Sequence, residues 1–433
     1  MPKLLQIVHG YPPRELAGTE IYAERLTRAL SERGWQVEIL AATRAPGRPQ
    51  ASWLPEEKDG AGNAIHRIVN NLPWRPLWAC EKDNSIAAAC NERITAINPD
   101  IVHVQHLLFL DLTLRLDAPS IVTLHDAWSW CPRGGSLLEH GKTPCSGPSP
   151  EKCPNCYGHF AKGSAMEHRL GHLASKINPI VSTERLHKAW RRAPPALRRW
   201  IQKGPAPTQR EGDLEARQLA VKQAFNDFDT RLSPSRFLSE EAEKQGVKPV
   251  EVFPHGVELS QPPQDPQHFL FVGSIAWHKG PDLVAKAWQL AKKEDPGLPK
   301  LRIAGPVVES DCAAAIPDSM KIGRITPSEV RAELSKAHAL VVGSIWPENS
   351  PLVILEARAA GCPVIVPDIG GIPEIVREGR DGWLYPPGNV ESLKERFLKW
   401  KELTSLQVAP PLRFETHVTR LEARYHQLLN QER

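Results

Sequence analysis

Short apolar runs alternate with amphipathic stretches along most of the chain, in the order expected for βαβ units. The run Leu4–Val8 predicts a buried strand, and a helix is expected from about Thr19, which can cap it, to Gly34. Further apolar runs predict strands that are buried on both faces of a parallel sheet: 37–40, 101–104 and 121–124. This alternation is typical of a doubly wound α/β domain.

The alternation is interrupted over residues 127–225, where helical pieces, prolines and cysteines replace it. It resumes before the proline-rich segment Gln261–Pro266, which predicts a linker, and a second α/β series follows. We therefore expect two doubly wound domains, residues 1–258 and 259–410, with the interruption forming a helical insertion in the first. Residues 411–433 predict a C-terminal helix that packs back on the first domain.

The most informative stretch, residues 344–357, follows an apolar strand. Ser350 can cap a helix, and Pro351 fits its first position, which needs no backbone donor. The free amides of that first turn suit a phosphate group in the cleft that two such domains would form. Glu348 precedes the helix and Glu356 lies two turns inside it. Taken alone, the pair also fits an ordinary strand–loop–helix with two solvated glutamates.

The spacing of these two glutamates resembles the Glu-x7-Glu signature of the family-4 retaining glycosyltransferases, which have the two-domain GT-B fold. Other motifs similar to the family's follow its order along the chain: Gly18-Thr19-Glu20, Asp100-Ile101-Val102-His103, Thr123-Leu124-His125-Asp126, Pro254-His255-Gly256-Val257-Glu258, Phe271-Val272-Gly273 through Lys279-Gly280, Gly361-x-Pro363-Val364 and Gly370-Gly371-Ile372-Pro373-Glu374. The resemblance covers roughly residues 1–126 and 230–430. It implies two Rossmann-like domains that face each other across a cleft, the first on the acceptor side and the second binding the nucleotide-sugar.

The resemblance also implies roles for individual residues. Glu348 would bind hydroxyls of the donor sugar, Lys279 would hold the diphosphate, and His125 would contact the transferred sugar from the opposite domain. These three are the candidate catalytic residues, and Glu356 would bind the ribose. The other candidate donor-binding residues are Gly18, Ser274, Arg324, Asn349, Ser350, Pro351 and Leu352. Ser274 stands where the family usually has arginine, and His278 is a candidate substitute for that cation.

The implied reaction moves a sugar from a nucleotide-diphosphate donor to an acceptor with retention of configuration. Front-face attack, in which a diphosphate oxygen receives the acceptor's proton, requires no carboxylate nucleophile, and no cofactor is expected for catalysis. The open alternatives for the acceptor are a cell-surface glycan and a lipid-linked saccharide. The open alternatives for the function are a sugar-nucleotide epimerase of the same architecture and a non-catalytic relative that binds glycans or anions. A dinucleotide oxidoreductase is disfavoured because no G-x-G-x-x-G motif follows a strand.

Four cysteines fall inside the predicted insertion, in a loop rich in glycine and proline: Cys131, Cys145, Cys153 and Cys156. Four thiolates that include one C-x2-C pair can form a tetrahedral structural zinc site. Four unlinked thiols and an iron–sulfur cluster are the alternatives. The Asp227-Phe228-Asp229 triplet and the pair His103 and His106 are interpreted as structural features rather than metal ligands.

Charge is distributed unevenly. The chain has 433 residues and a net charge of +4, with 54 basic and 50 acidic residues. Residues 161–210 alone hold eleven basic and two acidic residues together with Trp190 and Trp200. Such a segment can bind an anionic membrane surface or a lipid-linked acceptor, and a solvated helix face or another anionic partner are the alternatives. The remainder is slightly acidic, so nucleic-acid binding is not expected.

No apolar run approaches the roughly 18 residues of a membrane-spanning helix, and the N-terminus predicts a strand rather than a signal peptide. Eight cysteines in this length are too sparse for a disulfide scaffold. We therefore expect a cytoplasmic enzyme, with the basic segment as a means of peripheral attachment to the inner face of the membrane.

Overall fold

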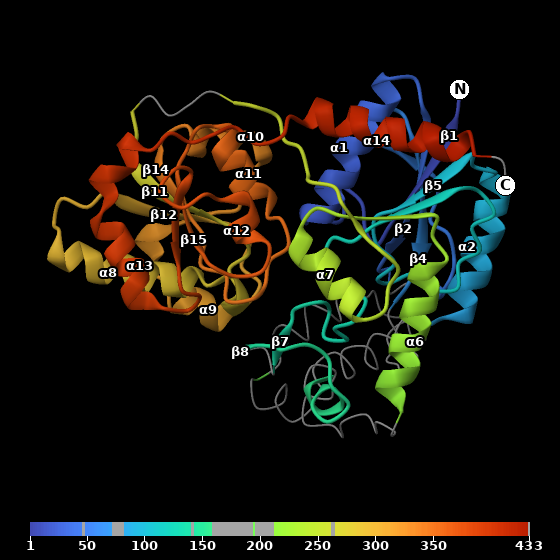
Figure 1. Ribbon diagram of the computed structural model, residues 1–433, viewed down its shortest axis with the longest axis horizontal. Coiled ribbons are helices and arrows are strands. Elements are labelled where there is room, and N and C mark those ends of the chain that lie inside the picture. The colour runs from blue at the N-terminus through green and yellow to red at the C-terminus, as the bar shows by residue number, and fades with distance from the viewer. Residues whose placement is uncertain are drawn as a thin grey trace.

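The computed structural model describes residues 1–45, 48–71, 82–139, 143–157, 194, 212–260 and 265–431. Within these residues the chain forms two α/β lobes that lie side by side (Figure 1). Most of the predicted linker lies outside the described residues. So does the basic segment 161–210, of which only residue 194 is described.

The first lobe is built on an eight-stranded sheet with the order β10-β9-β6-β5-β1-β2-β4-β3. Its strands are β1 (Lys3–Val8), β2 (Gln36–Thr43), β3 (Glu57–Lys58), β4 (Ala64–Val69), β5 (Ile101–Val104), β6 (Ser120–Thr123), β9 (Thr230–Ser233) and β10 (Glu251–Val252). All neighbouring strands pair in parallel except the edge strand β3. The strand order reverses between β1 and β5, and ligands of open α/β sheets bind at the carboxyl ends of strands at such a point.

Helices cover both faces of this sheet: α1 (Gly18–Glu32), α2 (Asn84–Ile97), α6 (Asp213–Asn226) and α7 (Arg236–Lys244). The expected cap at Thr19 is wrong. Helix α1 begins at Gly18, and Ala17, with its extended backbone, occupies the N-cap position without a side-chain hydrogen bond. The start of the helix is set by the preceding loop, which a buried arginine holds in place.

The second lobe contains a six-stranded, fully parallel sheet with the order β13-β12-β11-β14-β15-β16. Its strands are β11 (His268–Val272), β12 (Lys300–Ala304), β13 (Lys321–Gly323), β14 (Ala337–Val341), β15 (Val364–Pro367) and β16 (Gly382–Tyr385). Its helices are α8 (Pro281–Glu294), α9 (Ser310–Ala314), α10 (Pro327–Leu334), α11 (Leu352–Ala359), α12 (Ile372–Ile375) and α13 (Val390–Leu398). Alternate residues of β11 enter different cores, because Phe269 and Phe271 pack on one face and Leu270 on the other.

The C-terminal helix α14 (Phe414–Leu429) returns to the first lobe and lies beside α1 (Figure 1). Leu421 and Tyr425 are fully buried in a cluster that also contains Leu26 and Trp35. The Tyr425 hydroxyl is 2.6 Å from His103 Nδ1, so the helix is joined to the centre of the sheet by a polar contact as well.

The predicted insertion contains β-structure as well as helix among its described residues. Strands β7 (Leu138–Glu139) and β8 (Thr143–Pro144) form an antiparallel hairpin. The fully buried Arg217 of α6 donates hydrogen bonds to the carbonyl oxygens of Trp128 (2.7 Å) and Ser129 (2.9 Å). Helix α6 is thereby fixed to the segment that follows β6.

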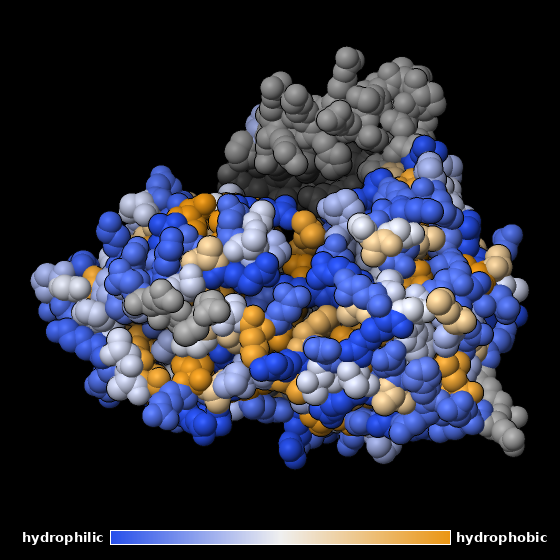
Figure 2. All heavy atoms as spheres, turned by 90° about the horizontal axis from the view of Figure 1, so that it is seen from above, coloured by the Kyte–Doolittle hydropathy of each residue, from blue (hydrophilic) through white to orange (hydrophobic). Residues whose placement is uncertain are grey.

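Among the described residues, no helix has both the length and the apolar character needed to cross a membrane. The face seen in Figure 2 is mostly hydrophilic, and its hydrophobic residues occur in small groups.

The packing of α14 predicts that Leu421→Ala lowers the free energy of unfolding by about 2–5 kcal/mol, because a fully buried leucine leaves a cavity. Urea denaturation followed by tryptophan fluorescence measures this change. The control is Leu219→Ala, at a leucine that is 55% exposed, which should change stability by no more than about 0.5 kcal/mol. Equal effects of the two variants would contradict the packing of α14 on the first lobe.

Candidate active site

A cavity of about 900 Å³ lies between the two lobes, at the carboxyl ends of strands from both sheets. Residues from each lobe line it, as expected for a ligand site between two doubly wound domains. All eleven residues predicted for the active site lie on its walls: Gly18, His125, Ser274, Lys279, Arg324, Glu348, Asn349, Ser350, Pro351, Leu352 and Glu356.

An ion pair between the partly exposed Lys279 and the buried Glu348 lies on the second-lobe wall. Lys279 Nζ lies 2.6 Å from Glu348 Oε1, which also accepts a hydrogen bond of 2.7 Å from the Ser344 hydroxyl. Burial opposes the charged carboxylate, but the Lys279 ammonium and the Ser344 hydroxyl outweigh it and lower the pKa of Glu348 below its usual value. Lys279 also lies over the ring of Trp346, 4.6 Å from its centroid. The cleft therefore holds a fixed cation and a fixed anion side by side.

The position of Lys279 depends on a close approach of two glycines. Gly280 has a φ of +63°, and a Cβ there would lie only 2.0 Å from the carbonyl oxygen of Gly343. The loop after β11 therefore lies directly against the end of β14, where Ile345 N donates a hydrogen bond to His278 O. A side chain at Gly280 would push Lys279 away from Glu348.

The loop before α11 presents backbone amides to the cavity. The expected cap at Ser350 is wrong, because Pro351 is the N-cap residue and has an extended backbone, so the helix begins one residue later than predicted. The N–H groups of Leu352 and Val353 belong to the first turn, which has no intrahelical acceptors for them, and both residues line the cavity. An anion can bind there.

An ion pair across the cleft joins Glu356 to the first lobe. Arg25 of α1 donates a hydrogen bond of 2.8 Å to Glu356 Oε1, and both side chains are largely buried. Arg25 is not among the residues predicted from the sequence, since its position in an amphipathic helix does not reveal which residue of the other lobe lies opposite. A ligand that hydrogen-bonds Glu356 must share this carboxylate with Arg25 or displace it.

Two further contacts hold the lobes together beside the cavity. The Asn349 amide donates to the carbonyl oxygens of Leu124 (3.2 Å) and His125 (3.0 Å), and its oxygen contacts the Ser235 hydroxyl. The Glu374 carboxylate accepts hydrogen bonds from the first backbone amides of α7, at 2.7 Å and 2.6 Å. Asn349 lines the cavity, but its side-chain hydrogen bonds are made with residues of the first lobe.

His125 lies opposite the ion pair on the first-lobe wall. Its Nε2 is 2.9 Å from Gln105 Oε1, and its ring stacks on His255 with an interplanar angle of 17°. Burial, together with the neighbouring His255, lowers the pKa of His125 well below 6.5. The imidazole is therefore neutral near pH 7, donates through Nε2 to Gln105, and keeps Nδ1 as an acceptor.

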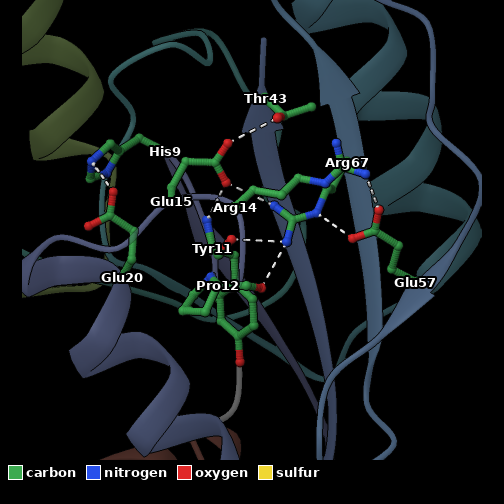
Figure 3. Close-up of polar contacts among 9 residues, drawn as sticks. All are labelled: His9, Tyr11, Pro12, Arg14, Glu15, Glu20, Thr43, Glu57 and Arg67. Atoms are coloured by element: carbon green, nitrogen blue, oxygen red, sulfur yellow. Dashed lines mark hydrogen bonds and ion pairs between the residues drawn. The ribbon is translucent and has the colours of Figure 1, made fainter. Parts of the chain in front are cut away.

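The loop between β1 and α1 is held by the fully buried Arg67 of β4 (Figure 3). The guanidinium donates to Glu57 at 2.8 Å, to Glu15 at 3.1 Å, and to the carbonyl oxygens of Tyr11 and Pro12 at 2.9 Å each. The contacts with Glu15, Tyr11 and Pro12 are all with the loop that leads to the start of α1. Arg67 therefore shapes this part of the cleft from within the lobe.

Two histidine–carboxylate pairs lie at the same edge of the sheet, and the sequence analysis did not identify them as site features. His9 Nε2 is 3.1 Å from Glu20 Oε1 (Figure 3), and His106 Nε2 is 3.2 Å from Asp126 Oδ2. His9, Glu20 and Asp126 line the cavity. Within the described part of the chain, Glu20 Oε2 is buried and has no hydrogen-bond partner. Because Glu20 lines the cavity, its carboxylate is a candidate acceptor for a ligand hydroxyl.

His278 does not suit the role of a substitute cation. Burial and the adjacent Lys279 lower its pKa below 6.5, so the neutral ring is favoured. Among the described residues, the cavity is also lined by five arginines: Arg14, Arg25, Arg28, Arg324 and Arg331.

The four predicted cysteine ligands lie outside the cleft and line a separate small cavity. In the described ranges, no three side chains of histidine, cysteine, aspartate or glutamate have the spacing of metal ligands. Asp229 accepts a hydrogen bond of 2.8 Å from Ser120 N, and His103 contacts Tyr425 and Thr123, so these residues have structural contacts.

Two facing Rossmann-like lobes with a cleft between them are the architecture of the GT-B fold. Residues 16–144 match the family described as Glycosyltransferase Family 4, and residues 258–410 match Glycosyl transferases group 1. One match falls in each lobe, and together they span most of the chain. The chain belongs to the family-4 glycosyltransferases.

Individual relatives match a smaller part of the chain. A D-inositol 3-phosphate glycosyltransferase of Streptomyces scabiei is 34% identical over 137 residues, which is 28% of this chain and 30% of that protein. The protein of the same name from Thermobifida fusca is 28% identical over 193 residues, 39% of this chain and 44% of that protein. The chain thus spans between about a third and a half of the length of these curated relatives.

Solved structures match the fold over nearly the whole chain. A sucrose-phosphate synthase from Thermosynechococcus elongatus has a TM-score of 0.61 at 16% identity and covers 99% of both chains. HepE from Anabaena, in complex with UDP-glucose, has a TM-score of 0.55 at 14% identity and covers 99% of this chain and 96% of HepE. At these identities the likeness shows the fold alone.

The buried histidines predict a loss of stability in acid. Burial lowers the pKa of both His103 and His255 to about 3, while the unfolded chain takes up these protons near pH 6.5. Because the unfolded state binds more protons below that pH, stability should fall from pH 6.5 downward by about 1.4 kcal/mol per pH unit for each histidine.

The test compares the pH dependence of urea unfolding in His103→Gln and in the parent between pH 6.5 and 4.5. The slope of the unfolding free energy against pH should be smaller in the variant, by an amount that corresponds to about one proton fewer taken up on unfolding. The control, His426→Gln at an exposed histidine, should keep the parent slope. A parent stability that rises as the pH falls would contradict the assignment.

Proposed function

We propose that this protein is a retaining glycosyltransferase that transfers a sugar from a nucleoside-diphosphate donor to a hydroxyl acceptor. One observation carries the proposal: the Lys279–Glu348 pair and Glu356 on one wall of the cleft face the neutral His125 on the other. A nucleotide-sugar requires a cation that binds its phosphates, carboxylates that bind its hydroxyls, and a further hydrogen-bond acceptor, here the imidazole.

The donor diphosphate would lie between Lys279 and the amides of Leu352 and Val353. Negative charge develops on the diphosphate as the bond to the sugar breaks, so these fixed donors stabilise the transition state more than the ground state. Ser274 supplies no charge here. Arg25 is placed to act as the second cation, once the ribose takes over its contact with Glu356.

The sugar would lie between Glu348 and His125. Glu348 accepts hydrogen bonds from sugar hydroxyls while Lys279 keeps it ionised, and His125 offers Nδ1 from the opposite lobe. The Asn349 hydrogen bonds hold His125 close to the start of α11. Closure of the lobes would therefore bring both sides of the donor site together. The donor class is further supported by HepE, whose structure contains UDP-glucose.

The acceptor would enter from the first lobe, beside His9 and Glu20. In front-face transfer the acceptor hydroxyl attacks the anomeric carbon on the side from which the diphosphate leaves, and a diphosphate oxygen takes the hydroxyl proton. The unpartnered Glu20 Oε2 would orient that hydroxyl. This scheme needs no resident metal or other cofactor. A cell-surface glycan or lipid-linked saccharide as acceptor, attachment of residues 161–210 to an anionic membrane, and a cytoplasmic location stay predictions from the sequence.

We predict that Glu348→Gln lowers kcat/KM for transfer by at least about 100-fold, because the sugar loses a charged acceptor and Lys279 loses its partner. Release of nucleoside diphosphate in the presence of acceptor measures the rate. The exposed Glu395 supplies a matched control, and Glu395→Gln should retain full activity. Unchanged transfer by the Glu348 variant would remove the donor-site assignment.

Binding of the donor can be tested without knowing the acceptor. A nucleoside diphosphate at 100 times its Kd stabilises the folded chain by about 2.7 kcal/mol, so UDP, GDP or ADP should raise the melting temperature. Glu356→Gln should reduce this shift, whereas Glu395→Gln should not. If no nucleoside diphosphate shifts the parent protein, it does not bind such a donor. Release of the free sugar or its epimer without transfer would instead favour a hydrolase or an epimerase.

A further inference from the structure

We propose that Cys131, Cys145, Cys153 and Cys156 bind one Zn²⁺ ion in a structural site beside the acceptor side of the first lobe. The four cysteines line the same cavity, whose volume is about 20 Å³. A single water-sized sphere occupies roughly 10–15 Å³, so this space suits one ion and not a cluster. The proposal does not depend on the transfer reaction, because metal content and stability are its readouts.

Local structure brings the cysteines together from three separate turns. Cys131 ends a turn in which its amide donates to Ala127 O at 2.8 Å, and Cys145 follows β8, with its amide 2.7 Å from Leu137 O. Cys153 and Cys156 belong to one helical turn, whose amides donate to Ser149 O and Lys152 O. A spacing of three residues places both sulfurs on the same side of that turn. A hairpin and a helical turn, each with cysteines, thus face one small space.

The surroundings suit sulfur that carries negative charge. Ser149 N donates a hydrogen bond of 3.3 Å to Cys153 Sγ, the kind of second-shell contact that supports a metal-bound thiolate. Arg133 and Lys152 line the same cavity.

The binding step requires neither an oxidant nor a reductant. Each of the four thiols releases one proton to solvent, and each sulfur uses an electron pair to form a bond to Zn²⁺ of about 2.3 Å. The complex carries two negative charges, which Arg133 and Lys152 are placed to offset. Because no three of these described sulfurs have ligand spacing, binding requires the four side chains to move closer together.

The metal would stabilise the segment that follows His125. Gly135 lies in the turn after Cys131 and has a φ of +77°, and a Cβ there would lie only 2.6 Å from Trp128 N. The loop that the metal closes therefore packs directly on the residues behind His125. Hairpin β7–β8 and helix α6 lie on the same side of the first lobe in Figure 1, away from α14. A metal would tie the helical turn of Cys153 and Cys156 to Cys131, which belongs to the first-lobe core.

The test measures metal by mass spectrometry in the full chain produced with added Zn²⁺. The parent should contain about one zinc per chain. The double variant Cys153→Ser/Cys156→Ser should contain at most about a tenth of that amount, since two of four ligands are lost. The matched control is Cys312→Ser, at a buried cysteine of the second lobe, which should keep the full zinc content.

A second measurement does not depend on the folding of a variant. Removal of zinc from the parent with a chelator should lower its melting temperature, and added Zn²⁺ should restore it, with no such response from Mg²⁺. The proposal is overturned if the zinc-supplied parent holds less than about a tenth of an equivalent. It is also overturned by undiminished zinc in the double variant, by iron with visible absorption in place of zinc, or by disulfides among these cysteines.

Discussion

The arrangement of the cleft depends on the ion pair between Lys279 and the buried Glu348. A carboxylate buried in this way is costly to desolvate, and it stays ionised because an ammonium at 2.6 Å and a hydroxyl at 2.7 Å compensate it. That geometry in turn requires the loop after β11 to lie against the end of β14. The contact between Gly280 and Gly343 permits this approach, because any side chain at Gly280 would strike the opposite backbone.

The two lobes meet around this pair through directional contacts that involve main-chain atoms. Asn349 donates hydrogen bonds to the carbonyl oxygens of Leu124 and His125. Glu374, in the second lobe, accepts hydrogen bonds from the first backbone amides of α7 in the first lobe. Such contacts fix the distance across the cleft without filling it, so the cavity between the walls remains large enough for a nucleotide-sugar. The stacked, neutral histidines behind His125 add a rigid wall that carries no charge.

Much of the candidate site was predictable because motif residues follow strands whose carboxyl ends share one edge. Glu348 and Lys279 therefore lie together, although 69 positions separate them in the chain. Arg25, Arg67 and the contact between His9 and Glu20 were missed because the packing of the segments, and not a motif, sets their partners. The caps predicted at Thr19 and Ser350 were wrong, because Ala17 and Pro351, both with extended backbones and neither making a capping side-chain hydrogen bond, occupy the N-cap positions.

By itself the sequence determined the alternation of strands and helices, the family, and many of the residues that line the cleft, because hydrophobic periodicity and motif spacing are local properties. Only the tertiary structure decided how those residues are used. It paired Arg25 with Glu356, engaged Asn349 in joining the lobes, made His125 neutral by burial, and gathered four cysteines around one small cavity. These outcomes depend on distances between segments far apart in the chain and on exclusion of water, which no local pattern encodes.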